Sequence, residues 1–154
     1  TSSYIVPYTT LFRSRCIRCR EVGRTVAPEE TAVSTFSYHS CGGEERFIQA
    51  GSGDALVGFA RLRFPHRPFR DELAGAALLR ELHVYGSVVP LGTPAAAEEW
   101  QHRSYGVRLL AAAEEAARDH GYGQLAVMSG VGVRPYYRKQ GYERVGPYMI
   151  KTFS

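Results

Sequence analysis

Cysteine is too scarce in this sequence for a disulfide framework, since only Cys16, Cys19 and Cys41 occur among 154 residues. Long apolar runs are absent as well, and none approaches the roughly 18 residues that a membrane span requires. The first residues also lack the basic segment and long apolar core of a secretory signal. These absences predict a cytoplasmic protein with no membrane partner, folded around one substantial core, and they leave the oligomeric state open.

Lysine is equally scarce, because 17 of the 19 basic residues are arginine, and the net charge is +4. The planar guanidinium of arginine binds phosphate through two parallel hydrogen bonds, whereas lysine acts more as a point charge. Five arginines fall between residues 13 and 24, and four more lie between 61 and 70. Two interpretations stay open: a solvated face that reflects high genomic GC content, and a surface for RNA or another polyanion.

The N-terminal segment, residues 1–13, shows no clear periodicity, and "VPYTTLFRS" resembles a translated cloning adaptor. We therefore expect a non-native or disordered leader there, and a single domain over 14–154. Within that domain, "RCIRCREVG" at 15–23 predicts a short strand or an extended arm. The polar segment 28–43, which ends in two glycines, predicts a connector.

The strongest hairpin signal is a pair of β-prone runs, at 46–50 and 55–64, that flank "GSGD". After a loop, "ALLRELHVYGSVVP" predicts another strand. Alternation places Leu82 on one face of this strand and Glu81 and His83 on the other.

A helix is predicted from about His102 to His120, with Gly121 as its left-handed cap. "GQLAVMSG" then predicts a short buried strand, and "VRPYYRKQG" a short helix that stops at Gly141. "GYERVGPYMIKTF" predicts one or two closing strands. The apolar stripe of the long helix consists of Leu109, Leu110, Ala113, Ala116 and Ala117.

This order of elements, together with "QHRSYG" at 101–106, resembles the GNAT superfamily of acetyl-CoA-dependent acyltransferases. The superfamily's pyrophosphate turn has the form Gln/Arg-x-x-Gly-x-Gly/Ala, and Ser104 stands here where the first glycine is usual. "RCIRCREVG", "ELHVYGSVVP", "MSGVGVRPYYRKQGY" and "GPYMIK" further resemble the acetyltransferase domain of the Elongator catalytic-subunit family. The resemblance covers about residues 15–154. It implies the GNAT acyl-CoA N-acyltransferase fold, an α/β (α+β) class with a mixed central sheet flanked by helices.

The resemblance also implies acetyl-CoA as the cofactor. Its pantetheine arm would run along the strand before the turn, against main-chain groups of Glu81, Leu82, His83 and Val84. Its phosphates would lie at the backbone amides where the long helix begins, which form a natural anion site. The residues implied on that side are Gln101, His102, Arg103, Ser104, Tyr105, Gly106 and Val107.

For catalysis, the resemblance places Tyr137 near the sulfur of CoA, while Tyr136 is interpreted as aromatic core. An ordinary phenol, with a pKa of about 10, protonates a thiolate of pKa about 8.5 only when it is well positioned. Glu81 and His83 share a strand face and are the candidate bases, with His83 better matched to neutral pH. His102 and a positioned water stay open as alternatives.

The pair Cys16 and Cys19 supplies only two of the four ligands of a structural zinc site. Relatives often carry a further cysteine where Ser14 stands, and we therefore expect no bound metal.

The implied function is that of an acetyl-CoA-binding acetyltransferase domain in an enzyme that modifies the tRNA wobble uridine. The domain would supply or hydrolyse the acetyl group, and the anticodon region of tRNA would be its partner. Full-length members add a radical S-adenosylmethionine domain, whose three-cysteine iron–sulfur motif this sequence lacks, so the chain alone would be incomplete. Two alternatives stay open: a stand-alone N-acetyltransferase of a lysine or small amine, and a non-catalytic tRNA-binding module.

Overall fold

The computed structural model describes residues 16–22, 31–85 and 96–153, and for Cys19 and residues 96–104 it describes the backbone alone. The predicted leader at 1–13 lies outside the described residues. The helical elements are α2 (Ile17–Arg20), η1 (Asp71–Leu73), α3 (Ala96–Asp119), η2 (Val131–Val133) and α4 (Arg134–Lys139). The strands are β1 (Ala32–Ser40), β2 (Gly43–Ser52), β3 (Ala55–Phe64), β4 (Ala76–Val84), β5 (Gln124–Val127), β6 (Glu143–Val145) and β7 (Tyr148–Thr152).

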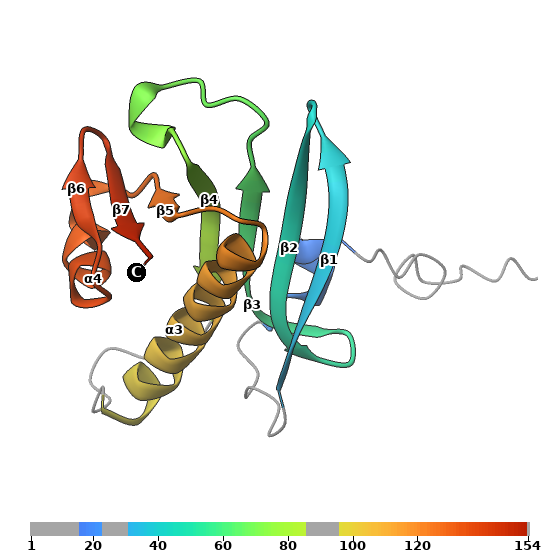
Figure 1. Ribbon diagram of the computed structural model, residues 1–154. Helices are drawn as coiled ribbons and strands as arrows, with labels where there is room; N and C mark the ends of the chain where they lie inside the picture. The colour runs from blue at the N-terminus through green and yellow to red at the C-terminus, as the bar shows by residue number, and fades with distance from the viewer. Residues whose placement is uncertain (1–15, 23–30, 86–95, 154) are drawn as a thin grey trace, which may run out of the picture.

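The strands form one mixed sheet of seven in the order β1-β2-β3-β4-β5-β7-β6 (Figure 1). β4 and β5 run parallel, and the other neighbouring strands of the described sheet are antiparallel. The predicted hairpin at 46–64, the following strand, the short strand after the long helix and both closing strands are confirmed.

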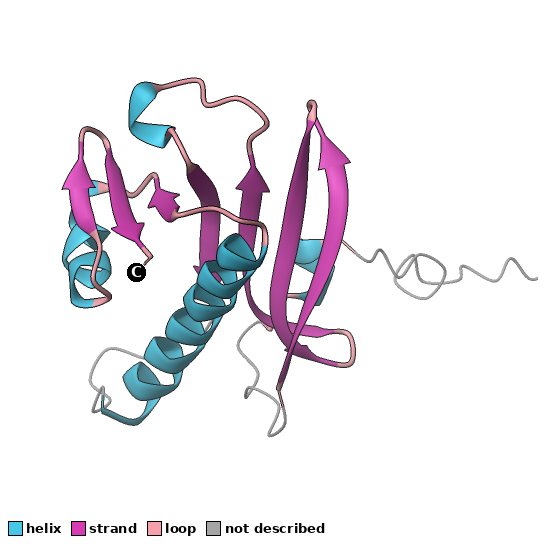
Figure 2. Cartoon of the chain, in the orientation of Figure 1, coloured by secondary structure: helices cyan, strands magenta, loops and turns pink. Residues whose placement is uncertain are grey.

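Two helical layers flank the sheet: α3 crosses one face in front of the strands, and Figure 2 shows α2 behind them. Consecutive residues of a strand point to opposite faces. Leu79 thus joins the main core beneath α3, while Leu78 joins a smaller cluster on the other face that includes Tyr148. The predicted stripe of α3 supplies the helical side of the main core, and its five residues are all buried. Burying each of its leucines stabilises the fold by about 1.5–3 kcal/mol.

The prediction of a connector at 28–43 is wrong, because residues 32–40 form β1 and pair with β2 along their whole length. Cys41 and Gly42 make the turn with φ of 47° and 71°, and positive values at both positions are what a two-residue type I′ hairpin turn requires. β1 is exposed over nearly its whole length, so it has no buried stripe to alternate with polar residues. Main-chain pairing and cross-strand contacts hold it instead.

The start of the domain differs from the prediction as well. Residues 17–20 form the single helical turn α2 rather than a strand or arm, and only Glu21 bridges to Leu56 of β3. The N–H of Val22 donates to the carbonyl of Leu56 at 2.8 Å, which ties this segment to the sheet.

The long helix begins at Ala96, earlier than the predicted start at His102, so the "QHRSYG" segment is helical. The preceding "AAAEEW" residues are mostly strong helix formers, which favours continuation in that direction. The end agrees with prediction: α3 closes at Asp119, and Gly121 takes a left-handed φ of 80°. None of the described helices is long and apolar enough to cross a membrane.

Candidate functional site

The centre of the site is the point where β4 and β5 separate. Their parallel ladder runs from Ala76–Gln124 to Leu79–Val127 and ends there, although β4 continues to Val84 against β3. Beyond Leu79, the side of β4 that faced β5 has no strand partner among the described residues. Because main-chain N–H and C=O groups need hydrogen-bond partners, this edge can pair with an extended ligand, as an added strand would.

A β-bulge shapes this stretch of β4. Arg61 of β3 pairs with Glu81, but the next residue, Leu62, pairs with Leu79, so Arg80 is the extra residue. The bulge lets Leu79 and Leu82 both face the core under α3 despite their spacing of three. In the sequence, Leu78 and Leu82 are four apart and fit regular alternation, so the apolar pattern does not reveal the bulge.

A pocket of about 190 Å³ opens where the two strands diverge. It brings together four of the predicted site residues: Glu81, Leu82, His83 and Tyr137. The sequence interpretation missed the contribution of the segment after β5, which lines the pocket with Met128, Ser129, Gly130 and Val133.

Tyr137 lies on α4 and is 7% exposed. Burial, together with the neighbouring Tyr136, raises the pKa of Tyr137 to about 12. Its ring makes edge-to-face contacts with Tyr136 at 5.2 Å and with Tyr142 at 5.6 Å, which fix its orientation. The phenol is therefore protonated at neutral pH and is able to donate a hydrogen bond.

Tyr136 was predicted as aromatic core, and its ring does pack against the main core. Its hydroxyl, however, is buried and has no hydrogen-bond partner among the described residues. The oxygen lies 3.1 Å from where a Cβ on Gly106 would stand, and Val84 Cγ2 is 3.8 Å from the same point. A buried hydroxyl without a partner requires an explanation, and a ligand group at this point would provide one.

The two candidate bases differ in their surroundings. Glu81 Oε1 accepts a hydrogen bond from Arg61. His83 is exposed, and its ring stacks on Phe59 with centroids 5.3 Å apart and makes no hydrogen bond to a described residue. Leu82 packs on the opposite side, against the main core, so the predicted division of the strand faces is confirmed.

The residues predicted to face the phosphates lie in the N-terminal half of α3. Gly106 is buried, Val107 is 37% exposed, and Tyr105 donates from its hydroxyl to Thr31 Oγ1 at 3.1 Å. The side chains of Gln101, His102, Arg103 and Ser104 lie outside the described residues.

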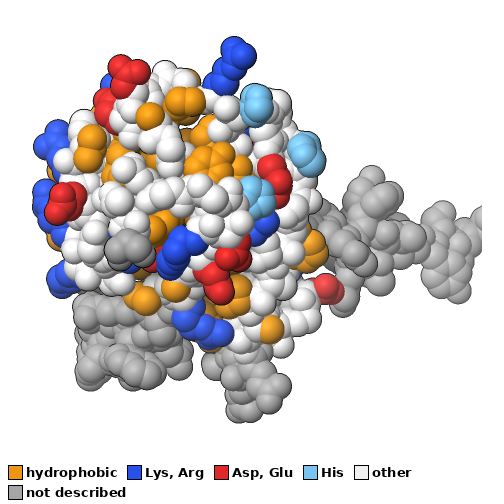
Figure 3. Space-filling model, in the orientation of Figure 1, with side chains coloured by type: hydrophobic (Ala, Val, Ile, Leu, Met, Phe, Trp, Pro, Cys, Tyr) orange, Lys and Arg blue, Asp and Glu red, His pale blue; other side chains and the backbone are white. Residues whose placement is uncertain are grey.

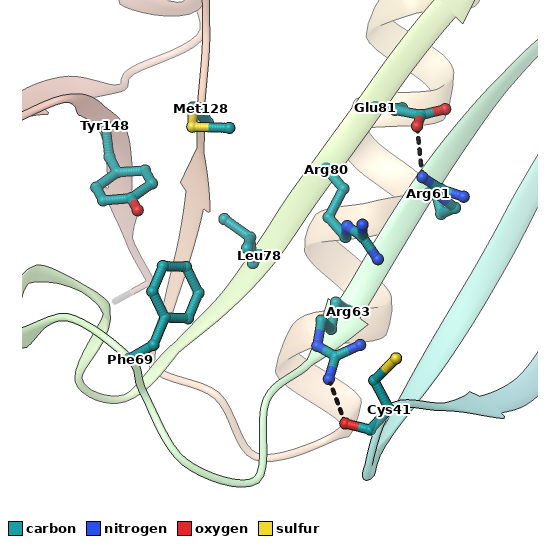
Figure 4. Close-up of a pocket in the computed structure, with 9 residues that line it drawn as sticks. All are labelled: Cys41, Arg61, Arg63, Phe69, Leu78, Arg80, Glu81, Met128 and Tyr148. Atoms are coloured by element: carbon teal, nitrogen blue, oxygen red, sulfur yellow. Dashed lines mark hydrogen bonds and ion pairs between the residues drawn. The ribbon is translucent and has the colours of Figure 1, made fainter.

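A second, larger cavity of about 430 Å³ lies on the sheet face opposite α3 and adjoins the pocket, with Arg80, Glu81 and Met128 lining both. Figure 4 shows two distinct walls. We call this cavity the arginine groove: Arg61, Arg63 and Arg80 form one wall, and Phe69, Leu78, Met128 and Tyr148 form the other.

The buried carboxylate of Glu45, 1% exposed, holds part of the basic wall. Its Oε1 accepts from Arg80 and, at 2.9 Å, from Arg63, while Oε2 accepts from the Tyr38 hydroxyl at 2.8 Å. Burial alone raises the pKa of Glu45, but these three hydrogen bonds outweigh it and hold the pKa below its ordinary value. Glu45 is thus an anion that fixes two guanidiniums.

The arginine cluster at 61–70 is divided by the fold. Arg61 and Arg63 enter the groove, Arg67 is exposed, and Arg70 pairs with Glu72 at 3.0 Å. On the face covered by α3, Figure 3 shows acidic and basic side chains interspersed. Among the described residues there is no cluster of three or more His, Cys, Asp or Glu that could hold a metal ion.

Comparison with known proteins shows which family the sequence matches. Residues 16–142 match the model of the "Acetyltransferase (GNAT) family". The chain is 43% identical over 150 residues to the tRNA uridine(34) acetyltransferase of Methanocaldococcus jannaschii, covering 90% of this chain and 28% of that protein. It is 44% identical to Elongator complex protein 3 of Danio rerio, covering 91% of this chain and 26% of that protein. The chain therefore spans only about a quarter of the length of these relatives.

Solved structures agree with the fold. An archaeal Elp3 of Methanocaldococcus infernus with an N-terminal deletion superposes with a TM-score of 0.80 at 41% identity, over 92% of this chain and 36% of that one. A putative streptothricin acetyltransferase of Bacillus anthracis, in complex with acetyl coenzyme A, superposes with a TM-score of 0.51 at 16% identity, over 71% of this chain and 64% of that one. The second likeness bears on the fold alone.

Proposed function

This chain belongs to the GNAT acetyltransferase family and has its fold, and we propose that it binds acetyl-CoA where β4 and β5 diverge. The observation that carries the proposal is the edge of β4 beyond Leu79, which has no strand partner in the part of the chain that the structure describes and which opens directly onto the pocket lined by Tyr137. The family and this geometry support an acetyl-transfer role for the pocket.

The residues present fit the proposed cofactor. Main-chain groups of Glu81, Leu82, His83 and Val84 would hold the pantetheine arm as an added strand pairs with a sheet edge. The bound thioester supplies an activated acetyl group, and the chain's own residues orient it and handle protons. The orphaned hydroxyl of Tyr136, beside Gly106, offers a further hydrogen bond on the side toward α3.

The phosphates would lie at the start of α3, with Gln101, His102, Arg103, Ser104, Tyr105, Gly106 and Val107 around them. Within a helix each N–H bonds to the carbonyl four residues earlier, so these amides are occupied when α3 begins at Ala96. We therefore infer that the cofactor-bound helix starts near His102, which frees the amides of the following turn.

Tyr137 would donate a hydrogen bond to the sulfur as the C–S bond breaks. With a pKa of about 12, the phenol is a weaker acid than a thiol of pKa about 8.5. Complete proton transfer to the released thiolate would thus cost roughly 5 kcal/mol. Stabilising the developing thiolate by hydrogen bonding is the more favourable role.

His83 is the better placed of the two bases, because the residue lines the pocket and its ring has no hydrogen bond to a described residue. It would accept the proton of the attacking acceptor or water, whose oxygen or carbon forms the new bond to the acetyl group. Glu81 is engaged by Arg61 and would instead position that guanidinium.

The acceptor would be tRNA, in keeping with the relatives named tRNA uridine(34) acetyltransferase. The groove beside the pocket is lined by three arginines, which repel a cationic amine and suit an anionic acceptor. Since the chain spans 28% of such a relative, we propose that the complete modification requires a radical S-adenosylmethionine domain as well.

A thiol-release assay with acetyl-CoA, with and without tRNA, tests this function. We expect slow release that tRNA stimulates, because the nucleic acid brings the acceptor to the pocket. Binding of both acetyl-CoA and tRNA without any thiol release would instead support a non-catalytic tRNA-binding module.

A further inference from the structure

We propose that the arginine groove binds one nucleotide of a single-stranded RNA segment, with its phosphate on Arg63 and Arg80 and its base against Phe69 and Met128. The inference rests on the proposed function, since it gives the acceptor a place beside the acetyl group. It follows from the two walls of the groove, from the buried carboxylate behind one of them, and from the continuity of groove and pocket.

Counting the described residues alone, the basic wall carries one uncompensated positive charge. Three guanidiniums line it, and the described carboxylates that pair with them are Glu45 and Glu81. Arg80 uses only Nη1 on a described residue, and its side chain is 40% exposed, so its other N–H donors face the groove. A guanidinium fork of this kind matches two oxygens of a phosphate.

Glu45 makes this wall rigid before any ligand arrives. One of its oxygens accepts from Arg63 and Arg80 together, and the Arg63 guanidinium also donates to the carbonyls of Ser40 at 3.2 Å and Cys41 at 3.0 Å. These hydrogen bonds restrict the rotamers of the two guanidiniums, most of all that of Arg63. A ligand that binds them loses less conformational entropy than it would on free surface arginines.

The opposite wall is apolar and open to solvent. Phe69 is 67% exposed and Met128 is 68% exposed, and both lie on the side of the cavity opposite the arginines in Figure 4. An exposed ring and thioether together offer a stacking surface for a base, as proteins that bind single-stranded RNA use. A cavity of about 430 Å³ is within the range of small-ligand sites.

A nucleotide satisfies both walls at once, because it joins an anionic phosphate to a flat, apolar-faced base. A simple anion would use only the arginines, and an apolar peptide only Phe69 and Met128. Since Arg80, Glu81 and Met128 also line the acetyl pocket, a nucleotide in the groove would lie next to the group to be transferred.

Fluorescence anisotropy with a labelled oligouridylate, repeated at several salt concentrations, tests the site. We expect Phe69→Ala and Arg80→Gln each to weaken binding about tenfold. Arg80→Gln should also lower the slope of log affinity against log salt by about one, whereas Phe69→Ala should leave it unchanged. The matched controls are Phe36→Ala on β1, where the ring is 56% exposed, and Arg138→Gln, exposed on α4; both should stay within twofold.

Photocrosslinking of the unaltered chain to a 5-iodouridine oligonucleotide gives an independent readout that needs no variant. We expect the crosslinked peptide to contain Phe69 or Met128. A crosslink confined to other surfaces, an oligonucleotide that fails to bind, or equal losses in the control variants would overturn the inference. An acidic peptide that binds the groove while uridine 5′-monophosphate does not compete would also overturn it.

Acetyl-CoA affinity of the same variants separates this inference from the proposed function. Intact acetyl-CoA binding with no effect of the groove substitutions on RNA binding would sink the groove site alone. A parent chain that binds the oligonucleotide in the groove but does not bind acetyl-CoA would sink the proposed function alone.

Discussion

Leu79 of β4 and Val127 of β5 form the last pair of the parallel ladder, and both line the pocket that opens immediately after it. Beyond it, the bulge at Arg80 turns one side of β4 toward the groove, while the unpaired edge faces the pocket. The proposed cofactor site and the proposed nucleotide site thus lie on the same stretch of β4, where pairing with β5 ends and the bulge occurs.

The hydroxyl of Tyr137 can be tested by Tyr137→Phe. We expect thiol release to fall by about 10²-fold, since removing one hydrogen-bond donor to a developing negative charge typically costs about 10²–10³, while acetyl-CoA affinity changes little. Tyr122→Phe is the matched control: it removes a hydroxyl that donates to the Pro65 carbonyl at 3.1 Å, away from the pocket. Equal rates for the parent and Tyr137→Phe would remove Tyr137 from the mechanism.

The raised pKa of Tyr137 makes a separate prediction about alkaline pH. Because burial holds this pKa at about 12, the phenol keeps its proton well above its ordinary value of 10. Its contribution should be lost only as pH rises through about 12, so thiol release should show no decline attributable to Tyr137 at pH 10. A Tyr137-dependent decline centred near pH 10, absent from Tyr137→Phe, would show an unperturbed phenol.

The close approach of Tyr136 to Gly106 predicts coupling between the two positions. Gly→Ala inside a helix normally stabilises it by about 1 kcal/mol. At Gly106, however, the new Cβ would stand 3.1 Å from the Tyr136 oxygen. Gly106→Ala should thus be more favourable in a Tyr136→Phe background than in the parent, by about 1 kcal/mol in the free energy of unfolding. A double-mutant cycle with no coupling would contradict this geometry.

The lowered pKa of Glu45 predicts how its contribution to stability depends on pH. Its ionised form is favoured in the fold, so the contribution is complete above the ordinary value of 4.5 and is lost as pH falls through the lower native pKa. Glu45→Gln should cost about 3 kcal/mol at pH 7, because Arg63 and Arg80 lose their partner. The difference from the parent should shrink in acid.

Denaturant unfolding at pH 7 and pH 3 measures that difference. Glu115→Gln, an exposed carboxylate on α3, provides the control and should have little effect at either pH. A cost of Glu45→Gln that is the same at both pH values would show that the Glu45 charge does not carry it.

The elements that could be predicted from sequence are those with a buried face or a glycine stop. The apolar stripe that includes Leu109 and Leu110 predicts α3. The left-handed glycines Gly121 and Gly141 predict where α3 and α4 end. β1 could not be found this way, because almost all of it is exposed and its stability comes from pairing with β2. The predicted start of α3 lies too late in the sequence, because the residues before the turn motif are themselves strong helix formers and extend the helix.

The candidate site divides in the same way. Glu81, Leu82, His83 and Tyr137 were predicted together from a family resemblance and meet in one pocket. The groove was not predicted, since it depends on a bulge at Arg80 and on a buried Glu45 from a distant strand. Such contacts depend on strand register, which local sequence does not specify.

Isothermal calorimetry with acetyl-CoA tests the central claim, that the cofactor occupies the opening between β4 and β5. Gly130 lines this pocket, and a Cβ there would meet nothing within 4 Å, so Gly130→Trp should block the pocket without disturbing the fold. Gly123→Trp, at an equally open glycine outside the pocket, is the control. We expect the parent and the control to bind acetyl-CoA, and Gly130→Trp to bind it at least tenfold more weakly. Equal affinity in all three proteins, or no binding by the parent at millimolar ligand, would contradict it.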